Sequence, residues 1–352
     1  MITSFLQRLS LATLTLIIFA CGPSRNINLT VTRPAEISFP SDTRTLLLVD
    51  RTKFESNAVN TLEGILTGEL PADDRVAAQE ALVSLKNRLN TSPRFEVKLF
   101  PDRLTGNSLT AAFPAALTWA QVNRLCTTNN AEVLISLEIF DSDFIVTNGT
   151  RIKKRFEGEG TNRREVEFTE YYAQGLGNLK MGIRVYHNAS KTIVDQQLFD
   201  EKKSWEAVGK DATDAAALLI SKSEANRFLA RLIGDDYAYK VAPLPITIDR
   251  DFYGRSKHCP AVATGTRYAD VNQWAKAIDE WKAGLNTAET KDAGKLAYNI
   301  AIGYEVLGEY GTALTWARDA YTKYGNKPSR EYSSMLEARI RDEKLLKQQM
   351  EK

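Results

Sequence analysis

Few residues of this 352-residue chain have side chains of the kind that catalyse reactions or bind metals. The two histidines, His187 and His258, lie in no catalytic motif and in no metal-ligand pattern. No GxSxG, HExxH or Walker-type loop occurs, and Cys259 next to His258 supplies too few ligands for zinc. We therefore expect no catalytic residue, no metal site and no bound cofactor, and hence a protein that is not an enzyme.

The cysteine whose position suggests a chemical role is Cys21, which ends an apolar run in LTLIIFACGPS, residues 14–24. About twelve largely apolar residues precede it, whereas a bilayer span needs about 20. Such a run is typical of the apolar core of a signal peptide. An ordinary secretory signal ends in small residues at positions −3 and −1, which Ala20 satisfies and Ile18 does not.

Residues 18–22, IFACG, resemble the lipobox of bacterial lipoproteins. The resemblance implies that residues 1–20 are a signal peptide, cut off just before Cys21, and that acyl chains such as palmitate are then attached to this cysteine. Several acyl chains on one residue give the stable anchoring that a single chain does not. The alternative is an ordinary signal whose apolar run happens to end in a cysteine.

The residues after Cys21 indicate where such a lipoprotein would stay. Residues 22–25 contain no acid, whereas in the lipoproteins that it resembles an Asp at the second position favours the inner membrane and an acidic cluster favours surface display. We therefore expect attachment to the outer membrane, facing the periplasm, with residues 21–39 as a lipid-anchored tether. This location excludes cytosolic cofactors, ATP and nucleic acid.

The composition is that of an ordinary globular protein, with 43% hydrophobic and 26% charged residues, and the length suggests about two domains. The net charge is only +2. A balance so close to zero argues against electrostatic capture of nucleic acid or anionic lipid. We expect membrane contact through the N-terminal lipid only.

Residues 40–252 combine strand and helix patterns, which predicts an α/β domain. In chain order the patterns predict strand 44–52, helix 71–90, strand 94–100, helix 117–130 and strand 131–140. This β-α-β-α-β order indicates a mixed sheet with helices packed on it. Cys126, on the second helix, is interpreted as a buried structural thiol.

Antiparallel hairpins and a long helix are predicted to complete this domain. Strands are expected at 144–156, 164–174, 179–188 and 192–199, joined by short polar or glycine-rich turns. A helix over 211–233 follows, with Asp211 as its N-cap. The hairpin at 144–174 carries many Lys, Arg and Glu residues, too many for a lipid-facing pore strand.

Four stretches of the domain carry a resemblance to known proteins: Asp50-Arg51 ending the first strand, RFEV (94–97) leading to a loop, NAEVLISLEIF (130–140), and RVYHNASKTIVDQQ (184–197) before the last helix. They are similar to the α/β domain of envelope lipoproteins such as the curli-secretion pore subunit and the lipoprotein activator of penicillin-binding proteins. With the repeats described next, the chain resembles a Bacteroidota-type group of envelope lipoproteins that pair such a domain with helical repeats.

Residues 258–352 are predicted to form an all-α domain, because residues 294–321 resemble a tetratricopeptide repeat. A second copy precedes it: Gly265, Tyr268, Asn272, Trp274, Ala277, Trp281 and Gly284 lie 36 residues before Ala301, Tyr304, Gly308, Tyr310, Ala313, Ala317 and Ala320. Small residues recur because helices that cross closely leave no room for larger ones. Tyr332, Leu336 and Ile340 predict a capping helix.

In tetratricopeptide repeats the first helix of each pair lines the inner groove. The facing positions of the second copy are Lys295, Tyr298, Ile302 and Glu305. A mixed apolar and charged strip of this kind suits an extended peptide or the tail of a partner protein. The alternative is a surface without a partner.

Together these features predict an outer-membrane lipoprotein that acts as a non-enzymatic, protein-binding adaptor or scaffold in cell-envelope assembly or maintenance. The alternative is an oligomeric structural or secretion-associated subunit that assembles through the α/β domain. A weaker alternative is a hydrolase of an envelope polymer, which would need a deep pocket with paired carboxylates.

Overall fold

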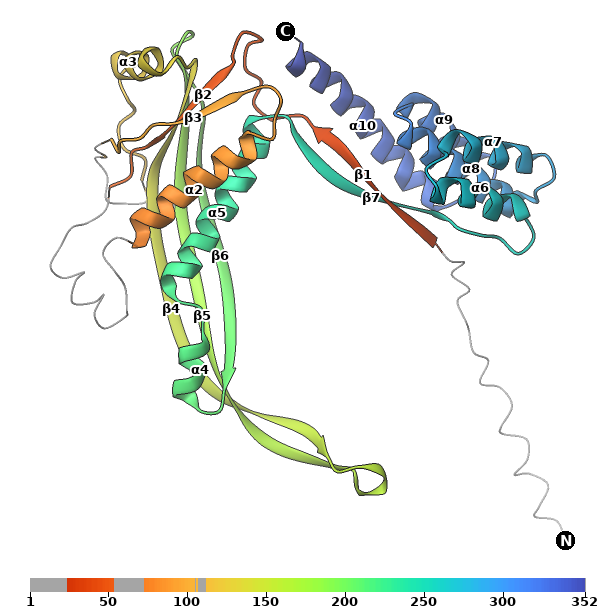
Figure 1. The fold of residues 1–352 in the computed structure, drawn as a ribbon, viewed down its shortest axis with the longest axis horizontal. Helices are drawn as coiled ribbons and strands as arrows, with labels where there is room; N and C mark the ends of the chain where they lie inside the picture. Colours follow the sequence, from red (N-terminus) through yellow and green to blue (C-terminus); the bar gives the residue numbers. More distant parts are fainter. Residues whose placement is uncertain (1–23, 54–72, 105, 107–111, 352) are drawn as a thin grey trace. The chain divides into compact units, whose positions relative to one another are not determined.

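The computed structural model describes residues 24–53, 73–104, 106 and 112–351, and these fold into two compact units (Figure 1). The α/β unit comprises residues 32–246 and the end of the chain from 345. The helical unit comprises residues 247–344 together with 24–31. The predicted fold class, an α/β part with a mixed sheet followed by an all-α part, is confirmed.

The α/β unit is built on a five-stranded sheet in the order β3-β2-β4-β5-β6. The strands are β2 (Thr45–Asp50), β3 (Glu96–Leu99), β4 (Val133–Glu157), β5 (Arg164–His187) and β6 (Thr192–Gly209). β2 runs parallel to both β3 and β4, whereas β4, β5 and β6 are antiparallel. The sheet is therefore mixed.

Helices cover both faces of the parallel part of the sheet. Leu46 and Leu48 of β2 pack with α2 (Asp73–Leu89) and α5 (Lys222–Val241), which lie side by side along the sheet in Figure 1. Leu47 and Val49 pack instead with α3 (Trp119–Asn129), where Cys126 is fully buried as predicted. Because both faces of β2 are buried, its sequence is apolar at successive positions rather than alternating.

β4 and β5 form a much longer hairpin than the sequence indicates. They pair without interruption from Val133 and His187 to Glu157 and Arg164, with one bulge near Leu137, and the short helix η1 (Gly160–Asn162) lies in the turn. The strands predicted separately on each side of the glycine-rich stretch at 175–182 are one strand. Glycine fits there because a Cβ at Gly175 would collide with the ring of Phe144.

The helix predicted over 211–233 is two helices. Asp211 caps α4 (Ala212–Leu218) as expected, accepting a hydrogen bond from the Asp214 amide. The chain then leaves the helical conformation, and Ser221 starts α5 through a capping box with Glu224. Ser221, an N-cap with extended backbone, therefore divides the predicted amphipathic helix in two.

Part of the predicted tether is a strand. β1 (Ser24–Arg33) pairs with β7 (Leu244–Tyr253) in a two-stranded sheet, so the prediction of a tether over 21–39 is wrong from residue 24 on. The pairing is antiparallel, because Asn26 bonds to Asp251 (3.2 Å) while the Ile37 amide bonds to the Lys240 carbonyl (2.9 Å). Apolar residues at alternate positions, which the N-terminal interpretation overlooked, produce this strand.

The helical unit contains α6 (Pro260–Asp270), α7 (Trp274–Leu285), α8 (Thr290–Val306), α9 (Tyr310–Thr322) and most of α10 (Pro328–Met350). The turns of the two helix pairs match at the predicted 36-residue offset: Asn272 (φ 59°) and Gly308 (φ 79°) are both left-handed. A Cβ at Gly265 would collide with the indole of Trp281. In the second pair their counterparts are both alanine, which fills the same crossing with two small residues. Within the described residues, no helix is long and apolar enough to cross a bilayer.

Candidate functional site

The four residues predicted to line a groove lie along α8, as expected, but their face is covered by the protein's own chain. Residues 250–256, which we call the groove segment, include the end of β7 and run along α8. Arg250 makes a two-bond ion pair with Glu305 at 2.8 and 2.9 Å. At the other end, Lys295 donates to the Ser256 hydroxyl at 2.8 Å.

The middle of the groove segment is held by an amide side chain and by stacked rings. Asn299, fully buried, accepts from the Tyr253 amide and donates to the Tyr253 carbonyl, both at 2.8 Å. Tyr298 packs between Tyr253 (5.6 Å between ring centroids) and Tyr332 (5.3 Å). This burial raises the pKa of Tyr298 to about 12.

The four predicted residues therefore lie together on α8, but their side is covered by a segment of the same chain and not by a partner protein. Ile302 and Glu305 are buried, with 0% and 3% of their surfaces exposed, and Glu305 also accepts from the Tyr332 hydroxyl. The prediction that they line an open groove is wrong, because the groove segment, which runs from the end of the predicted α/β domain towards the repeats, fills it. Asn299 was the missed signal: an amide among apolar positions of a helix satisfies backbone groups of an extended chain.

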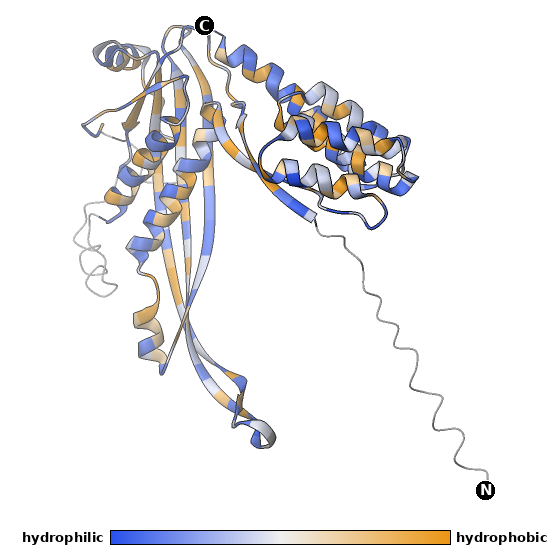
Figure 2. Cartoon of the chain, turned by 45° about the vertical axis from the view of Figure 1, so that its right-hand side comes forward, coloured by the Kyte–Doolittle hydropathy of each residue, from blue (hydrophilic) through white to orange (hydrophobic). Residues whose placement is uncertain are grey.

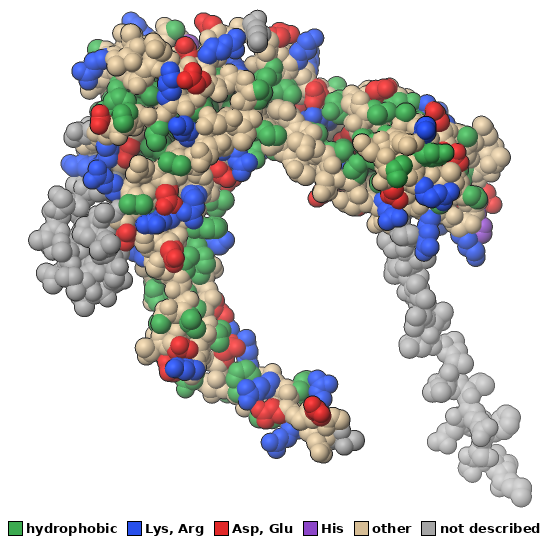
Figure 3. All heavy atoms as spheres, in the orientation of Figure 1, with side chains coloured by type: hydrophobic (Ala, Val, Ile, Leu, Met, Phe, Trp, Pro, Cys, Tyr) green, Lys and Arg blue, Asp and Glu red, His purple; other side chains and the backbone are tan. Residues whose placement is uncertain are grey.

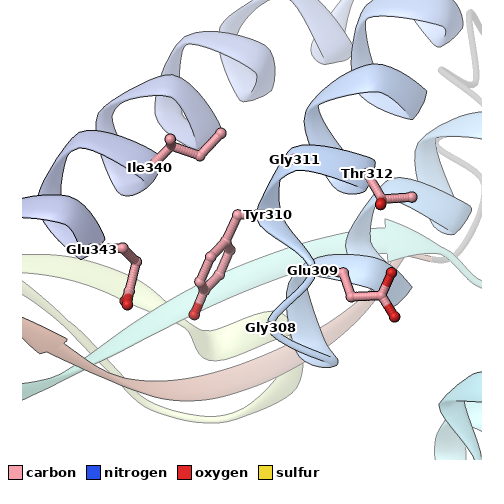
Figure 4. A pocket seen from close by; sticks show the side chains of 7 residues that line it. All are labelled: Gly308, Glu309, Tyr310, Gly311, Thr312, Ile340 and Glu343. Carbon is pink, nitrogen blue, oxygen red and sulfur yellow. The ribbon is translucent and has the colours of Figure 1, made fainter. Parts of the chain in front are cut away.

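A shallow hollow of about 400 Å³ lies beside the start of α9 (Figure 4). Its lining residues are Gly308, Glu309, Tyr310, Gly311, Thr312, Ile340 and Glu343. Figure 4 shows Tyr310 pointing between α9 and α10, with Glu309 directed to the other side of the start of α9. Glu343 is ion-paired with Arg339, whose guanidinium lies 5.2 Å from the Tyr310 ring. The hollow does not present two facing carboxylates.

A buried charge cluster lies in the α/β unit, on the face of the sheet that carries α3. Glu138 accepts from Arg51 (3.2 Å) and from the Tyr186 hydroxyl (2.9 Å) through Oε1. Its Oε2 lies 2.7 Å from Nη1 of Arg184, as an ion pair outside hydrogen-bond angles. The side chain of Glu138 is fully buried, and those of the two arginines are at least 92% buried.

This cluster holds a loop of the chain rather than an open site. Arg51 donates to the Ala115 carbonyl (2.9 Å) and Arg184 to the Pro114 carbonyl (3.1 Å). The Leu117 amide donates to the Tyr186 hydroxyl at 3.1 Å. The buried charges therefore fasten residues 114–117 onto the sheet. This role of Arg51 does not show in the sequence, because its partners Ala115 and Glu138 are 64 and 87 residues away.

The remaining residues singled out for possible chemistry are dispersed. His187 Nδ1 lies 2.7 Å from the Ser190 hydroxyl, within the turn between β5 and β6, and that hydroxyl also bonds to Thr192. His258 is exposed and Cys259 buried, and burial raises the pKa of the Cys126 thiol to about 11. Among the described residues, no three His, Cys, Asp or Glu side chains are placed to hold a metal. Cys21 lies outside the described residues.

The end of the β4–β5 hairpin is the most exposed apolar part of the described chain. We call residues 145–176 the arm. Five of its apolar side chains are exposed: Ile145 (54%), Val146 (50%), Ile152 (72%), Phe156 (60%) and Leu176 (44%). Figure 2 shows hydrophobic and hydrophilic residues alternating along its strands. Ion pairs cross the strands, and Arg151 bonds to both Glu170 and Glu206.

Within the described chain, the strands of the arm have edges that no third strand pairs with. β6 is the last described strand of the sheet, and from Ile145 outward the only described strand paired with β4 is β5. From Arg164 to Glu170, β5 does not pair with β6, so the outer arm is a two-stranded ribbon. Free edges present unpaired backbone donors and acceptors, which can pair with a strand of another chain.

Two solved structures illustrate the likeness of this fold to known proteins. A neuraminyllactose-binding hemagglutinin homolog from Helicobacter pylori is 11% identical, with 58% of this chain and 86% of that chain covered and a TM-score of 0.24. A PelC dodecamer from Paraburkholderia phytofirmans is 8% identical, with 60% and 96% covered and a TM-score of 0.22. At these TM-scores neither likeness bears on function. No curated protein matches the chain.

Two family models match, one in each part of the chain. Residues 263–342 match the model described as Domain of unknown function (DUF6340). Residues 43–253, well over half of the chain, match the model described as Domain of unknown function (DUF8603) and include β2 to β7 with the whole arm. The protein therefore belongs to the family described as Domain of unknown function (DUF8603).

Proposed function

We propose that the protein is a lipid-anchored, periplasm-facing scaffold of the outer membrane that binds other envelope proteins and catalyses no reaction. The arm carries this proposal, because Ile152 and Phe156 stand exposed on a ribbon whose two edges pair with no other strand of the described chain. Unpaired edges together with exposed apolar side chains indicate a site where another chain can bind. The groove segment already fills the site that the sequence suggested, so partner binding is assigned to the arm.

A protein partner has two ways of binding such a ribbon. It can add a strand to a free edge through backbone hydrogen bonds, with specificity supplied by alternate side chains. It can also cover the apolar side chains Ile145 and Leu176, which face each other across β4 and β5. Strand addition would draw its affinity mainly from backbone hydrogen bonds, whereas covering the apolar side chains would draw it from buried apolar area.

Site-specific cross-linking in cells tests the proposal. A photoreactive amino acid at Ile152 or Phe156 is expected to give discrete cross-linked bands, because these side chains would lie in the interface. The control is the same amino acid at Arg75, an exposed position on α2 away from the arm. Equal cross-linking at Arg75 and at the arm positions, or none at either, would count against the arm.

The proposed anchor is tested separately. Labelled palmitate should enter the full-length protein and should be lost in Cys21→Ser, because this change removes the thiol to which the acyl chain is joined. Incorporation that persists in Cys21→Ser would refute the lipid attachment without touching the role of the arm.

A second candidate function, an oligomeric structural or secretion-associated subunit, is favoured by the same free edges. The edges of β4 and β6 differ in sequence, so copies that join them side by side would do so head to tail, which closes into a ring or continues as a filament. Sizing the chain from residue 22 distinguishes the two functions. A monomer or dimer supports the scaffold, and a large closed assembly supports the subunit.

A further inference from the structure

Positive charge collects at one end of the helical unit, although the whole chain is nearly neutral. Successive helices of this unit alternate in direction, so α6, α8 and α10 all begin at the same end. Four exposed basic side chains belong to the segments at this end, and we call them the basic end: Arg255, Lys257, Lys291 and Lys327. The exposed His258 adjoins them in sequence.

Contacts in the structure show that these segments meet. The Ser256 hydroxyl donates to Asp292 at 2.6 Å, which joins the loop after β7 to the start of α8. Asn326 donates to the Tyr253 hydroxyl at 3.2 Å, which joins the loop before α10 to the same place. Figure 3 shows Lys and Arg side chains gathered on the lower edge of the helical unit.

Few acids oppose the basic end. Asp292 is 5% exposed and already accepts from Lys295 at 2.7 Å, so its charge is neutralised within the fold. Two exposed acids lie at this end: Glu289 just before α8, and Glu331 in the first turn of α10, where it adjoins the exposed Arg330. Asp270 and Glu309 belong to the opposite end of the helices, where α6 stops and α9 starts. The aligned helix dipoles of α6, α8 and α10 add positive potential at the basic end.

The chain enters the helical unit in the direction of the basic end. β1 is antiparallel to β7, and β7 continues into the loop that carries Arg255 and Lys257. Followed backwards from Arg33 to Ser24, β1 therefore runs in the direction of this loop. Arg25 is ion-paired with Asp270 (3.4 Å), the last residue of α6, so Ser24 lies beside α6 and about one length of that helix, roughly 16 Å, from the basic end. Only two residues separate Ser24 from Cys21, and this span is at most about 11 Å when fully extended.

We propose that the basic end of the helical unit binds the headgroups of anionic phospholipids, and that it seats this unit on the membrane to which Cys21 is attached. The inference rests on the proposed lipid attachment. A short link keeps Ser24 within about 11 Å of the bilayer surface. An anionic bilayer surface attracts the exposed basic residues of a domain that is held near it. The acyl anchor supplies the second signal for a fixed orientation.

Vesicle binding by the chain from residue 22, which retains every described residue but carries no acyl group, tests the proposal. Sedimentation with phosphatidylcholine vesicles is compared with sedimentation with vesicles that contain about one third phosphatidylglycerol. We expect binding only to the anionic vesicles and its loss as salt is raised, because exposed charges are screened. Equal binding to both kinds of vesicle, or to neither, would overturn the proposal.

Charge-reversal variants locate the binding surface. Arg255→Glu, Lys257→Glu and Lys291→Glu together should weaken binding to anionic vesicles by at least roughly a hundredfold, since the loss of each basic residue near such a surface costs about fivefold and each new carboxylate is repelled as well. The matched control reverses three exposed residues of the α/β unit, Arg75→Glu, Lys202→Glu and Lys210→Glu. Equal losses in the two triple variants would mean that net charge alone acts, and would overturn the assignment.

Two further readouts keep the outcome clear. The salt dependence of the unchanged chain needs no variant, so a folding defect in the charge-reversed protein, detected by circular dichroism, does not remove the test. Palmitate incorporation is measured on the full-length chain, so failure of the vesicle assay and failure of the lipid attachment are distinguished.

Discussion

The groove segment and the arm are both extended chain, but their surroundings differ in kind. Both ends of the groove segment have a polar partner on α8: Arg250 pairs with Glu305, and Ser256 accepts from Lys295. The arm presents Ile152 and Phe156 to solvent and leaves backbone edges unpaired within the described chain. The groove segment resembles a peptide that is already bound. The arm resembles a strand that has not yet paired with a partner. This difference moves the expected partner from the helical repeats to the sheet.

Charge shows the same contrast between buried and exposed parts. The arm carries several ion pairs, including Lys154 with Glu165 at 2.7 Å, but both partners are largely exposed. The cluster around Glu138 has similar groups in a site that excludes water. Exposed pairs contribute about 0–1 kcal/mol, whereas breaking a buried pair leaves an uncompensated charge. The two regions should therefore respond very differently to loss of one charge.

The largest effect is expected for Glu138→Gln. Arg51 and Arg184 would remain buried without a counter-ion, which should lower the free energy of unfolding by about 3–5 kcal/mol. Denaturant unfolding measures the loss. The matched control is Arg151→Gln on the arm, where the exposed ion pairs predict a loss below about 1 kcal/mol. Similar losses in both variants would remove the distinction drawn between the cluster and the arm.

Loss of the amide that holds the groove segment is expected to come next. In Asn299→Ala the Tyr253 amide loses its partner, and the Tyr253 carbonyl keeps only the Thr266 hydroxyl at 3.2 Å, which should cost about 1–3 kcal/mol. Protease sensitivity of residues 250–256 measures the effect directly, because a released segment becomes cleavable. If Asn299→Ala neither destabilises the protein nor exposes the segment, the groove is not held as the structure describes.

The sequence predicted local order well and long-range partners poorly. Strand 44–52, the helix containing Cys126 and the 36-residue repeat follow from apolar spacing, which depends only on neighbours in the chain. The continuity of β5 could not be predicted in this way. Glycines, which usually interrupt strands, lie in β5 against the rings of Phe144 and Trp205. Local pattern contains no information about a ring contributed by another strand.

The four positions predicted to line a groove lie together on α8, but what covers them was not predicted. Lys295, Tyr298 and Glu305 contact residues 250–256, and Ile302 is buried in the helical core. No local feature of residues 250–256 shows that they return to α8. The basic end was missed for a related reason. A net charge of +2 averages over the whole chain, whereas the side chains of Arg255 and Lys291 come together only through the fold.

A smaller effect separates backbone strain from steric crowding in the helical repeats. Gly308 has φ 79° with no atom within 4 Å of an added Cβ, so Gly308→Ala should cost about 1–2 kcal/mol through conformation alone. Gly311, three residues on, is helical and equally open. Gly311→Ala should be neutral or stabilising by up to about 1 kcal/mol. Thermal melting of the pair gives both numbers, and equal melting temperatures would contradict the left-handed turn.

The smallest effect concerns the ion pairs of the arm, and its direction follows from linkage. Hydrogen bonds from Arg151 and Gln174 lower the pKa of Glu206 from 4.5 to about 2. Because the folded pKa is lower than the unfolded one, the contribution to stability is complete above about pH 4.5 and is lost as the pH falls through about 2. An NMR titration of Glu206 should show this low pKa, and Arg151→Gln should return it towards 4.5. A pKa of Glu206 near 4.5 in the unchanged protein would mean that Arg151 does not hold these strands together. Because both partners are exposed, this clasp acts mainly on register: it keeps Ile152 and Phe156 at fixed positions on the ribbon, where a partner would meet them.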